Sequence, residues 1–551
     1  MTMPTANALV PSGPFVRRGA LTGTGALIRH ILRRDRVRLM IWILMVPAFA
    51  SSVGYAYQHM YDDASLAAQA AVMRTPTGIV LAGPGYGLDD YTPAAATANE
   101  LTLWLVMALA LLGILHVVRH TRAEEETGRL ELVTAQPVGR HAPATAAIAT
   151  LTVALLLVGL LGTAALSALD GFPAADAAAM MTGSAAAGLA FGAVALVTAQ
   201  VTTSARAATG LALVVLVAAF VVRAAGDVAE LHGSALSWFS PVAWAQQTRA
   251  FVDVRWWPVA LPVALVVALI AASAALAARR DLGAGLLAAR SGPARGRIGS
   301  PAALAWRQQR GALGWTALGF AVMLFATGTM MTSISDTMTD IVSDNPAFAA
   351  MFGEDPAGFE SAFLDVILMF TATGVAAYAI AAAARASSEE SSGRLELLLA
   401  LPVSRARWFG AQVLAAAAGA VLVLAIAVAA LWAGCAAVGM TDPGGADFGR
   451  AIAFHAAAVL VFCSVGAALV AALPRALGIA WALLAVAFLF DMFGPLFDLP
   501  DAALAASPFR AGSGALSADG DPVPVTICAA VAAVLFAAAS IAFRRRDLRA
   551  G

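Results

Sequence analysis

Residues 101–132 read LTLWLVMALALLGILHVVRHTRAEEETGRLEL, an apolar run that ends in an acidic segment. The first charge in it is Arg119, and an uncharged run of this length is typical of a helix that crosses a bilayer. Similar runs recur throughout the 551 residues, of which 60% are hydrophobic and only 12% charged. Soluble domains carry about a quarter charged residues. The sequence therefore predicts an all-α integral membrane protein and disfavours a large soluble helical protein.

The apolar runs predict twelve transmembrane helices. In the first half of the chain they are expected at 39–57, 101–119, 144–169, 177–202, 208–225 and 257–278. In the second half they are expected at 312–333, 362–383, 409–437, 450–472, 477–496 and 523–543.

The basic residues predict the orientation of these helices. All 34 are arginine, and 28 of them fall in the N-terminus, the even-numbered loops and the C-terminus. Cytoplasmic loops of membrane proteins carry the excess of positive charge, so both termini are expected to be cytoplasmic. The opposite loops are acidic, for example at Asp89, Asp90 and, after the seventh span, Asp336, Asp340 and Asp344. The first span, which follows 38 residues, is expected to act as an uncleaved signal.

The chain also contains an internal duplication. The acidic segment EEETGRLEL at 124–132 recurs 265 residues later as EESSGRLEL at 389–397. Two further markers follow in the same order: RRDL at 279–282 matches 545–548, and Ser240-Pro241 matches Ser507-Pro508. Each repeat begins inside and crosses six times, so the two repeats are expected to be parallel. A stretch rich in Gly, Ala, Arg and Ser at 283–301 is the predicted linker between them.

The duplicated acidic segment carries the strongest functional signal in the sequence. It follows the second span of each repeat, where a cytoplasmic loop would ordinarily be basic. Helix formers fill it until Pro137 or Pro402, which predicts a short surface helix. One interpretation is a solvated helix whose carboxylates pair with nearby arginines such as Arg129 and Arg140. The other, which its presence in both repeats favours, is a docking helix for a cytoplasmic partner.

This combination of six spans and the pattern E-E-x-x-G-R-L-E-L-x-x-x-x-P-x-x-R resembles the type-2 ABC exporter permeases. The fused twelve-span form resembles actinobacterial exporters of polyketide antibiotics of the tetronasin-resistance type. The resemblance implies that 122–140 and 385–405 are coupling helices, each seated on one of two copies of a separate nucleotide-binding ATPase subunit. It assigns this contact to the following residues: Glu124, Glu125, Glu126, Gly128, Arg129, Glu131, Glu389, Glu390, Gly393, Arg394 and Glu396.

The resemblance also implies a domain plan and a location. Residues 1–38 form a cytoplasmic N-terminus with an interfacial elbow helix at 22–38, and 39–282 the first half. Residues 283–311 form the linker and a second elbow helix at 302–311, and 312–551 the second half. The protein is expected in the bacterial cytoplasmic (inner) membrane. It would export hydrophobic or amphiphilic compounds such as antibiotics or lipids, along a path lined by the second and fifth spans of each half.

The sequence argues against catalytic chemistry in this chain. A phosphate-binding P-loop needs a lysine, which the chain lacks, so ATP and Mg²⁺ are expected only on the partner ATPase. The net charge of zero gives no reason to expect a nucleic-acid partner. The three cysteines lie in apolar runs and are interpreted as small buried residues. His116 and His120 have the i, i+4 spacing of zinc ligands, but no third ligand follows at a suitable spacing, so a role at the helix end is favoured and no metal is predicted.

One intramembrane pair of charges remains. Aligning the fifth span with the eleventh places Arg223 opposite Asp491. Ionisable residues within a bilayer are costly and usually paired, so the two are predicted to form an interhelical ion pair, with snorkelling to the outer headgroups as the alternative. Their scarcity disfavours the rival function, an ion-coupled secondary multidrug transporter, because such transporters need ionisable groups near the bilayer midplane.

Overall fold

A computed structural model describes residues 19–280, 298–331, 356–493, 507–516 and 520–547, together with 283, 285, 286 and 296. The chain divides into two compact units, residues 1–292 and 293–551, called here the first and second halves. Most of the predicted linker, and the acidic loop with Asp336, Asp340 and Asp344, lie outside the described residues.

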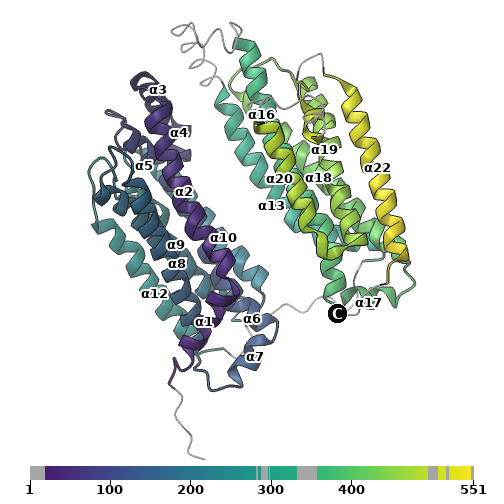
Figure 1. Cartoon of the computed structure of the whole chain (residues 1–551), viewed down its shortest axis with the longest axis horizontal. Coiled ribbons are helices and arrows are strands. Elements are labelled where there is room, and N and C mark those ends of the chain that lie inside the picture. The colour runs from purple at the N-terminus through teal and green to yellow at the C-terminus, as the bar shows by residue number, and fades with distance from the viewer. Residues whose placement is uncertain are drawn as a thin grey trace, which may run out of the picture. The chain divides into compact units, whose positions relative to one another are not determined.

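Each half is a bundle of helices (Figure 1). The first half contains α1 (Thr24–Arg34), α2 (Arg36–Met60), α3 (Asp63–Met73), α4 (Pro76–Leu81), α5 (Pro93–His120), α6 (Arg122–Glu126), α7 (Arg129–Thr134), α8 (Ala142–Leu166), α9 (Ala174–Val201), α10 (Ala205–Ala229), α11 (Pro241–Gln246) and α12 (Ala260–Ala277). The second half contains α13 (Pro301–Thr329), α16 (Pro356–Ser391), α17 (Arg394–Leu399), α18 (Arg405–Ala437), α19 (Gly445–Ala472), α20 (Gly478–Phe493) and α22 (Pro522–Arg545).

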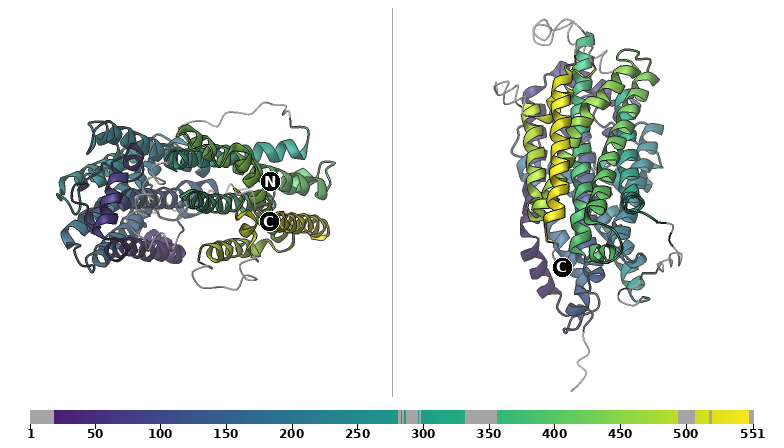
Figure 2. Two further views of the ribbon diagram at one scale, coloured as in Figure 1. Left: turned by 90° about the horizontal axis from the view of Figure 1, so that it is seen from above. Right: turned by 90° about the vertical axis from the view of Figure 1, so that its right-hand side faces the viewer.

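Twelve of the described helical segments are long and apolar enough to cross a membrane, which confirms the predicted number. Within the second half the long helices run side by side along a common direction (Figure 2). Helices suit a bilayer because they satisfy every backbone hydrogen bond internally. The observed segments exceed several predicted ones at their starts. The eighth, for example, runs over 363–391, so the acidic residues Glu389 and Glu390 belong to the helix itself.

The helix starts are encoded locally by capping residues followed by proline. The Thr92 hydroxyl accepts a hydrogen bond from the Ala95 amide, with Pro93 in the first turn of α5. Ser300 and Asp521 cap α13 and α22 in the same way, again followed by proline. A capping side chain satisfies an amide that the helix leaves open, and proline has no amide to leave open.

The centre of packing is equivalent in the two halves. In the first half α5 and α9 are the most buried spans, and in the second half α19 and α16 are. These are the second and fourth spans of each repeat. Gly113 of α5 faces the backbone of Gly188 and Gly192 on α9 so closely that a Cβ there would clash. Small residues at a crossing allow helices to approach at backbone distance, which is how spans pack without a hydrophobic drive between them.

The halves differ at their first spans. Residues 22–38 contain a separate helix, α1, which ends at Asp35 before α2 begins. Residues 302–311, in contrast, form the first turns of α13 and are not a separate helix. The cause lies at Asp35, whose carboxylate is held by side chains of α5 at the break, whereas α13 has no equivalent break in its hydrogen bonding. Of the three cysteines, Cys435 and Cys463 are buried and Cys528 is partly buried.

The alternation of the twelve spans with the arginine bias predicts which loops can be labelled from outside. In a background with the three cysteines replaced by alanine, Asp90→Cys and Glu230→Cys should react with a membrane-impermeant maleimide on intact cells. Gln136→Cys and Ala400→Cys should react only after permeabilisation. All four positions are exposed, so accessibility to the reagent depends on the side of the membrane alone. Labelling of position 136 or 400 in intact cells would invert the orientation.

Candidate functional site

The two acidic segments, residues 122–140 and 385–405, have the same backbone geometry. In each, a helix ends, a glycine adopts a left-handed conformation, and a short helix follows: α7 after Gly128 (φ 72°) and α17 after Gly393 (φ 71°). A residue with a Cβ pays roughly 1–2 kcal/mol for this conformation, so glycine is required by the turn. α7 ends at Thr134 and α17 at Leu399, each three residues before the proline expected to stop it.

The middle glutamate of each segment is engaged inside its own half. Glu125 is 8% exposed and accepts hydrogen bonds from Arg280 at 2.6 Å and 3.0 Å, from Arg122 at 2.7 Å and from the Gly283 amide at 2.7 Å. Its counterpart Glu390 pairs with Arg546. Arg280 and Arg546 come from the repeated RRDL motif after the sixth span. The structure thus ties the two duplicated motifs to one another in both halves.

Two further contacts are repeated. Arg140 and its counterpart Arg405 both donate to a backbone carbonyl at the end of the sixth span, that of Arg280 at 3.4 Å and that of Arg546 at 3.1 Å. Glu389 accepts from Arg394 at 2.9 Å and 3.0 Å, and this hydrogen bond raises the pKa of Arg394 above its ordinary value. The first half repeats this pair more loosely, with Arg129 3.8 Å from Glu124.

The remaining glutamates differ in their surroundings. Glu124 also pairs with Arg34 of α1, and Glu126 accepts the Ala205 amide at 2.7 Å, at the start of α10. Glu131 and Glu396 are exposed on α7 and α17. The glutamates at 124–126 and 389–390 therefore hold the segment to its own half. This geometry supports the interpretation of paired carboxylates for those five, and leaves α7 and α17 as the outward surface.

That surface carries a feature that the sequence analysis missed. Leu132 and Leu397, again 265 residues apart, are each 75% exposed, although neither lies in a candidate membrane span. A large apolar side chain held out on a short helix in both repeats marks a contact surface, since apolar groups at the centre of an interface contribute most when they are buried by a partner. The spacing of the repeat was the signal that could have identified them.

A cavity of about 570 Å³ lies behind the first acidic segment. Glu125, Arg140 and Arg280 line its polar end, and apolar side chains of α8, α9 and α12 line the remainder. The segment is thus held to the sixth span by ion pairs rather than by close apolar packing.

The predicted intramembrane pair lies in two different halves, whose relative placement is not defined, so it stays a prediction. Within its own half, Arg223 is fully buried, pairs with Asp227 one turn later at 3.4 Å and donates to the carbonyls of Ile79 and Val80 on α4. Asp491 accepts a hydrogen bond from Ser507. The predicted fifth span ended at 225 and so left out Asp227, although the i, i+4 spacing marks it as a partner.

Comparison with known proteins identifies relatives along the whole chain. The model of the C-terminal domain of the multidrug efflux system permease Rv1217c matches residues 298–544. The multidrug efflux system permease protein Rv1217c of Mycobacterium tuberculosis is 36% identical over 552 residues, which cover 97% of this chain and 96% of the relative.

The ion pair between Glu125 and Arg280 should be energetically coupled. Removing one partner of a buried pair costs about 3–5 kcal/mol, because the other charge stays buried without compensation. We therefore expect Glu125→Gln and Arg280→Met each to lower the thermal unfolding midpoint of the purified protein, and the double variant to lose less than the sum. Glu390→Gln with Arg546→Met should behave likewise. Glu396→Gln, at an exposed position, is the control and should change stability by less than about 0.5 kcal/mol. Additive losses would show that the pairs do not interact.

Proposed function

Because this chain belongs to the family of the multidrug efflux system permease Rv1217c, we propose that it is the membrane-spanning permease subunit of an ATP-driven exporter. The energy would come from a separate ATPase, of which one copy binds each acidic segment. The proposal rests on the duplicated segment: two identical outward surfaces, α7 and α17, each tied by ion pairs to the end of the sixth span of its half. Two equivalent surfaces fit two copies of one partner.

The absence of lysine supports a separate energy source. No phosphate-binding loop can be built in this chain, so nucleotide and Mg²⁺ would bind only to the partner. We place α7 and α17 on the cytoplasmic side, where ATP is available, in agreement with the excess of arginine on that side.

The structure refines which residues would contact the ATPase. The contact is assigned to Leu132 and Leu397, flanked by the charged residues Arg129, Glu131, Arg394 and Glu396 of the same short helices. Glu125 and Glu390 would act one step behind, by holding the short helix against the end of the sixth span. A push on α7 would then reach α12 through Glu125 and Arg280.

The substrate is proposed to be hydrophobic or amphiphilic, as the printed name of the relative describes multidrug efflux and the spans are lined by apolar residues. That the path follows the second and fifth spans of each half stays a prediction.

A substitution at the exposed leucines should separate docking from folding. Leu132→Asp and Leu397→Asp, singly and together, should reduce co-purification of the P-loop ATPase encoded beside this protein and reduce drug efflux, because an apolar contact is replaced by a buried charge. The unfolding midpoint of the permease alone should not change, since neither side chain packs on its own half. Gln136→Ala is the matched control at an exposed position of the same segment. Full association with the double variant would mean that the partner binds elsewhere.

The energy source distinguishes this proposal from an ion-coupled secondary transporter. Efflux of a fluorescent hydrophobic dye from cells that express the permease with the ATPase should stop when ATP is depleted and continue when a protonophore collapses the ion gradient. It should also require the ATPase gene. Efflux that stops with the protonophore while ATP remains, and that needs no ATPase, would establish the secondary transporter instead.

A further inference from the structure

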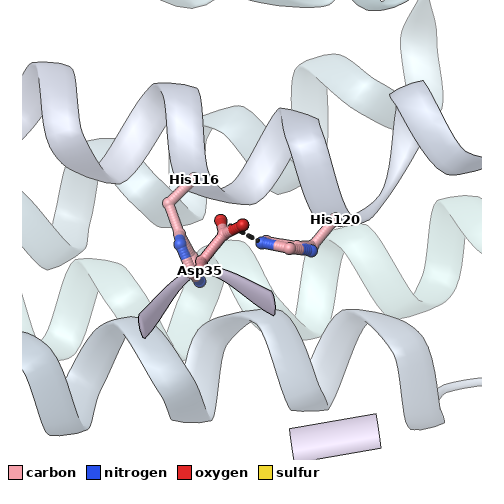
Figure 3. A group of neighbouring side chains, drawn as sticks. All are labelled: Asp35, His116 and His120. Carbon is pink, nitrogen blue, oxygen red and sulfur yellow. Dashed lines mark hydrogen bonds and ion pairs between the residues drawn. The ribbon is translucent and has the colours of Figure 1, made fainter. Parts of the chain in front are cut away.

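Three buried side chains that the proposed function does not use converge at the end of α5. His116 and His120 lie one turn apart on α5, and Asp35 occupies the break between α1 and α2 (Figure 3). All three are buried, with exposures of 0%, 5% and 3% respectively. One ligand atom from each lies within 4.8 Å of the other two. The third ligand that the sequence lacked after His120 is thus supplied by a residue 85 positions earlier.

His116 presents a nitrogen that has no partner. Its Nε2 lies 2.9 Å from the Thr150 hydroxyl, which in turn lies 2.9 Å from the Ala146 carbonyl on the same helix. The hydroxyl has one proton, and donating it to the carbonyl leaves Thr150 as the acceptor of the His116 Nε2–H. Nδ1 then carries the lone pair of a neutral imidazole, and it is buried without a hydrogen-bond partner among the described residues. A buried lone pair with no partner is unusual in a folded protein.

The carboxylate of Asp35 is held by groups that a cation can replace. His120 Nε2 lies 2.9 Å from Oδ2, Arg119 lies 3.3 Å from Oδ1, and Arg38 lies 3.8 Å from Oδ2. The Arg119 side chain is 44% exposed, so it can turn into solvent when another positive charge takes its place. Both guanidiniums oppose a bound cation, and the site is accordingly expected to be weaker than a closed four-ligand zinc site.

The second half provides an internal comparison. At the repeat offset of 265, His116, His120 and Thr150 correspond to Ala381, Arg385 and Ala415. Arg385 donates to the Gln308 carbonyl at 2.6 Å, so the first and second spans of that half are joined without a histidine. Since this joint does not require imidazoles, the pair in the first half has a chemical capacity that packing alone does not explain.

We propose that Asp35, His116 and His120 bind a divalent transition-metal ion of the zinc type, with water in the fourth position. Two imidazole nitrogens and one carboxylate oxygen are ligands that zinc prefers at about 2.0–2.2 Å. The three side chains have to close by rotation from their present separation. His120 has to release its Nε2 proton to solvent when it coordinates the metal. Thr150 then serves as the outer partner that fixes the ring of His116.

A metal here would join the break between α1 and α2 to the last turn of α5. The acidic segment begins directly after that turn, at Arg122, and α1 contacts it through the Arg34–Glu124 ion pair. Binding would therefore stiffen the start of the first acidic segment, and only in the first half, because the second half lacks the ligands.

Binding is tested on the full-length protein, purified in detergent with a tag that contains no histidine, with ZnCl₂ as the probe. Equilibrium dialysis should give about one zinc ion per chain. His116→Gln, His120→Gln and Asp35→Asn should each weaken binding at least tenfold, and Thr150→Val about tenfold, as loss of an outer partner does. His59→Gln and His141→Gln are matched controls outside the cluster and should bind zinc as the unaltered protein does.

A second measurement needs no variant that has to fold. Co²⁺ added to the unaltered protein should produce the strong visible absorption of a tetrahedral site, and excess Zn²⁺ should remove it. Absence of the absorption, or zinc retention that His116→Gln leaves unchanged, would show that the three side chains form a buried hydrogen-bonded cluster only.

Discussion

A carboxylate at the end of the second span binds an arginine at the end of the sixth span in each half of this permease. The pairs Glu125–Arg280 and Glu390–Arg546 join the two sequence motifs that survive best between the repeats. They determine where α7 and α17 project, because each short helix is connected to its second span only through a glycine turn. The orientation of the outward surface therefore depends on these pairs, while the apolar spans determine only that the helices are present.

The number and approximate position of the spans could be predicted, since a bilayer imposes length and apolarity on every helix. The duplication was equally readable, because residues that make the same contacts in both halves keep their spacing. What the sequence could not provide was the partner of each charge. Glu125 and Glu390 were predicted to face another protein, and they face Arg280 and Arg546 of their own half. Contacts between residues some 155 positions apart follow from packing and leave no local pattern.

The differences between the halves are as informative as their likeness. Asp227 satisfies Arg223 one turn away, whereas the corresponding span of the second half holds Asp491 against Ser507. Asp35 interrupts the helix that precedes the first span and meets His116 and His120, whereas α13 continues without interruption. Selection for two equal docking surfaces would preserve α7 and α17, and these differences leave that equality intact. A chain with two halves can thus keep one common contact and add chemistry to one side only.

The central claim is that an ATPase seats on both short helices of the acidic segments. A photo-reactive phenylalanine analogue placed at position 132 or at position 397 tests it most directly, because both side chains point outward and the probe reports only contacts within its own reach. Irradiation of cells that contain permease and ATPase should give a covalent adduct of the two proteins from either position, with none from the same analogue at position 104, which is exposed on α5 away from the segment. Adducts from position 104 but from neither 132 nor 397 would contradict the account.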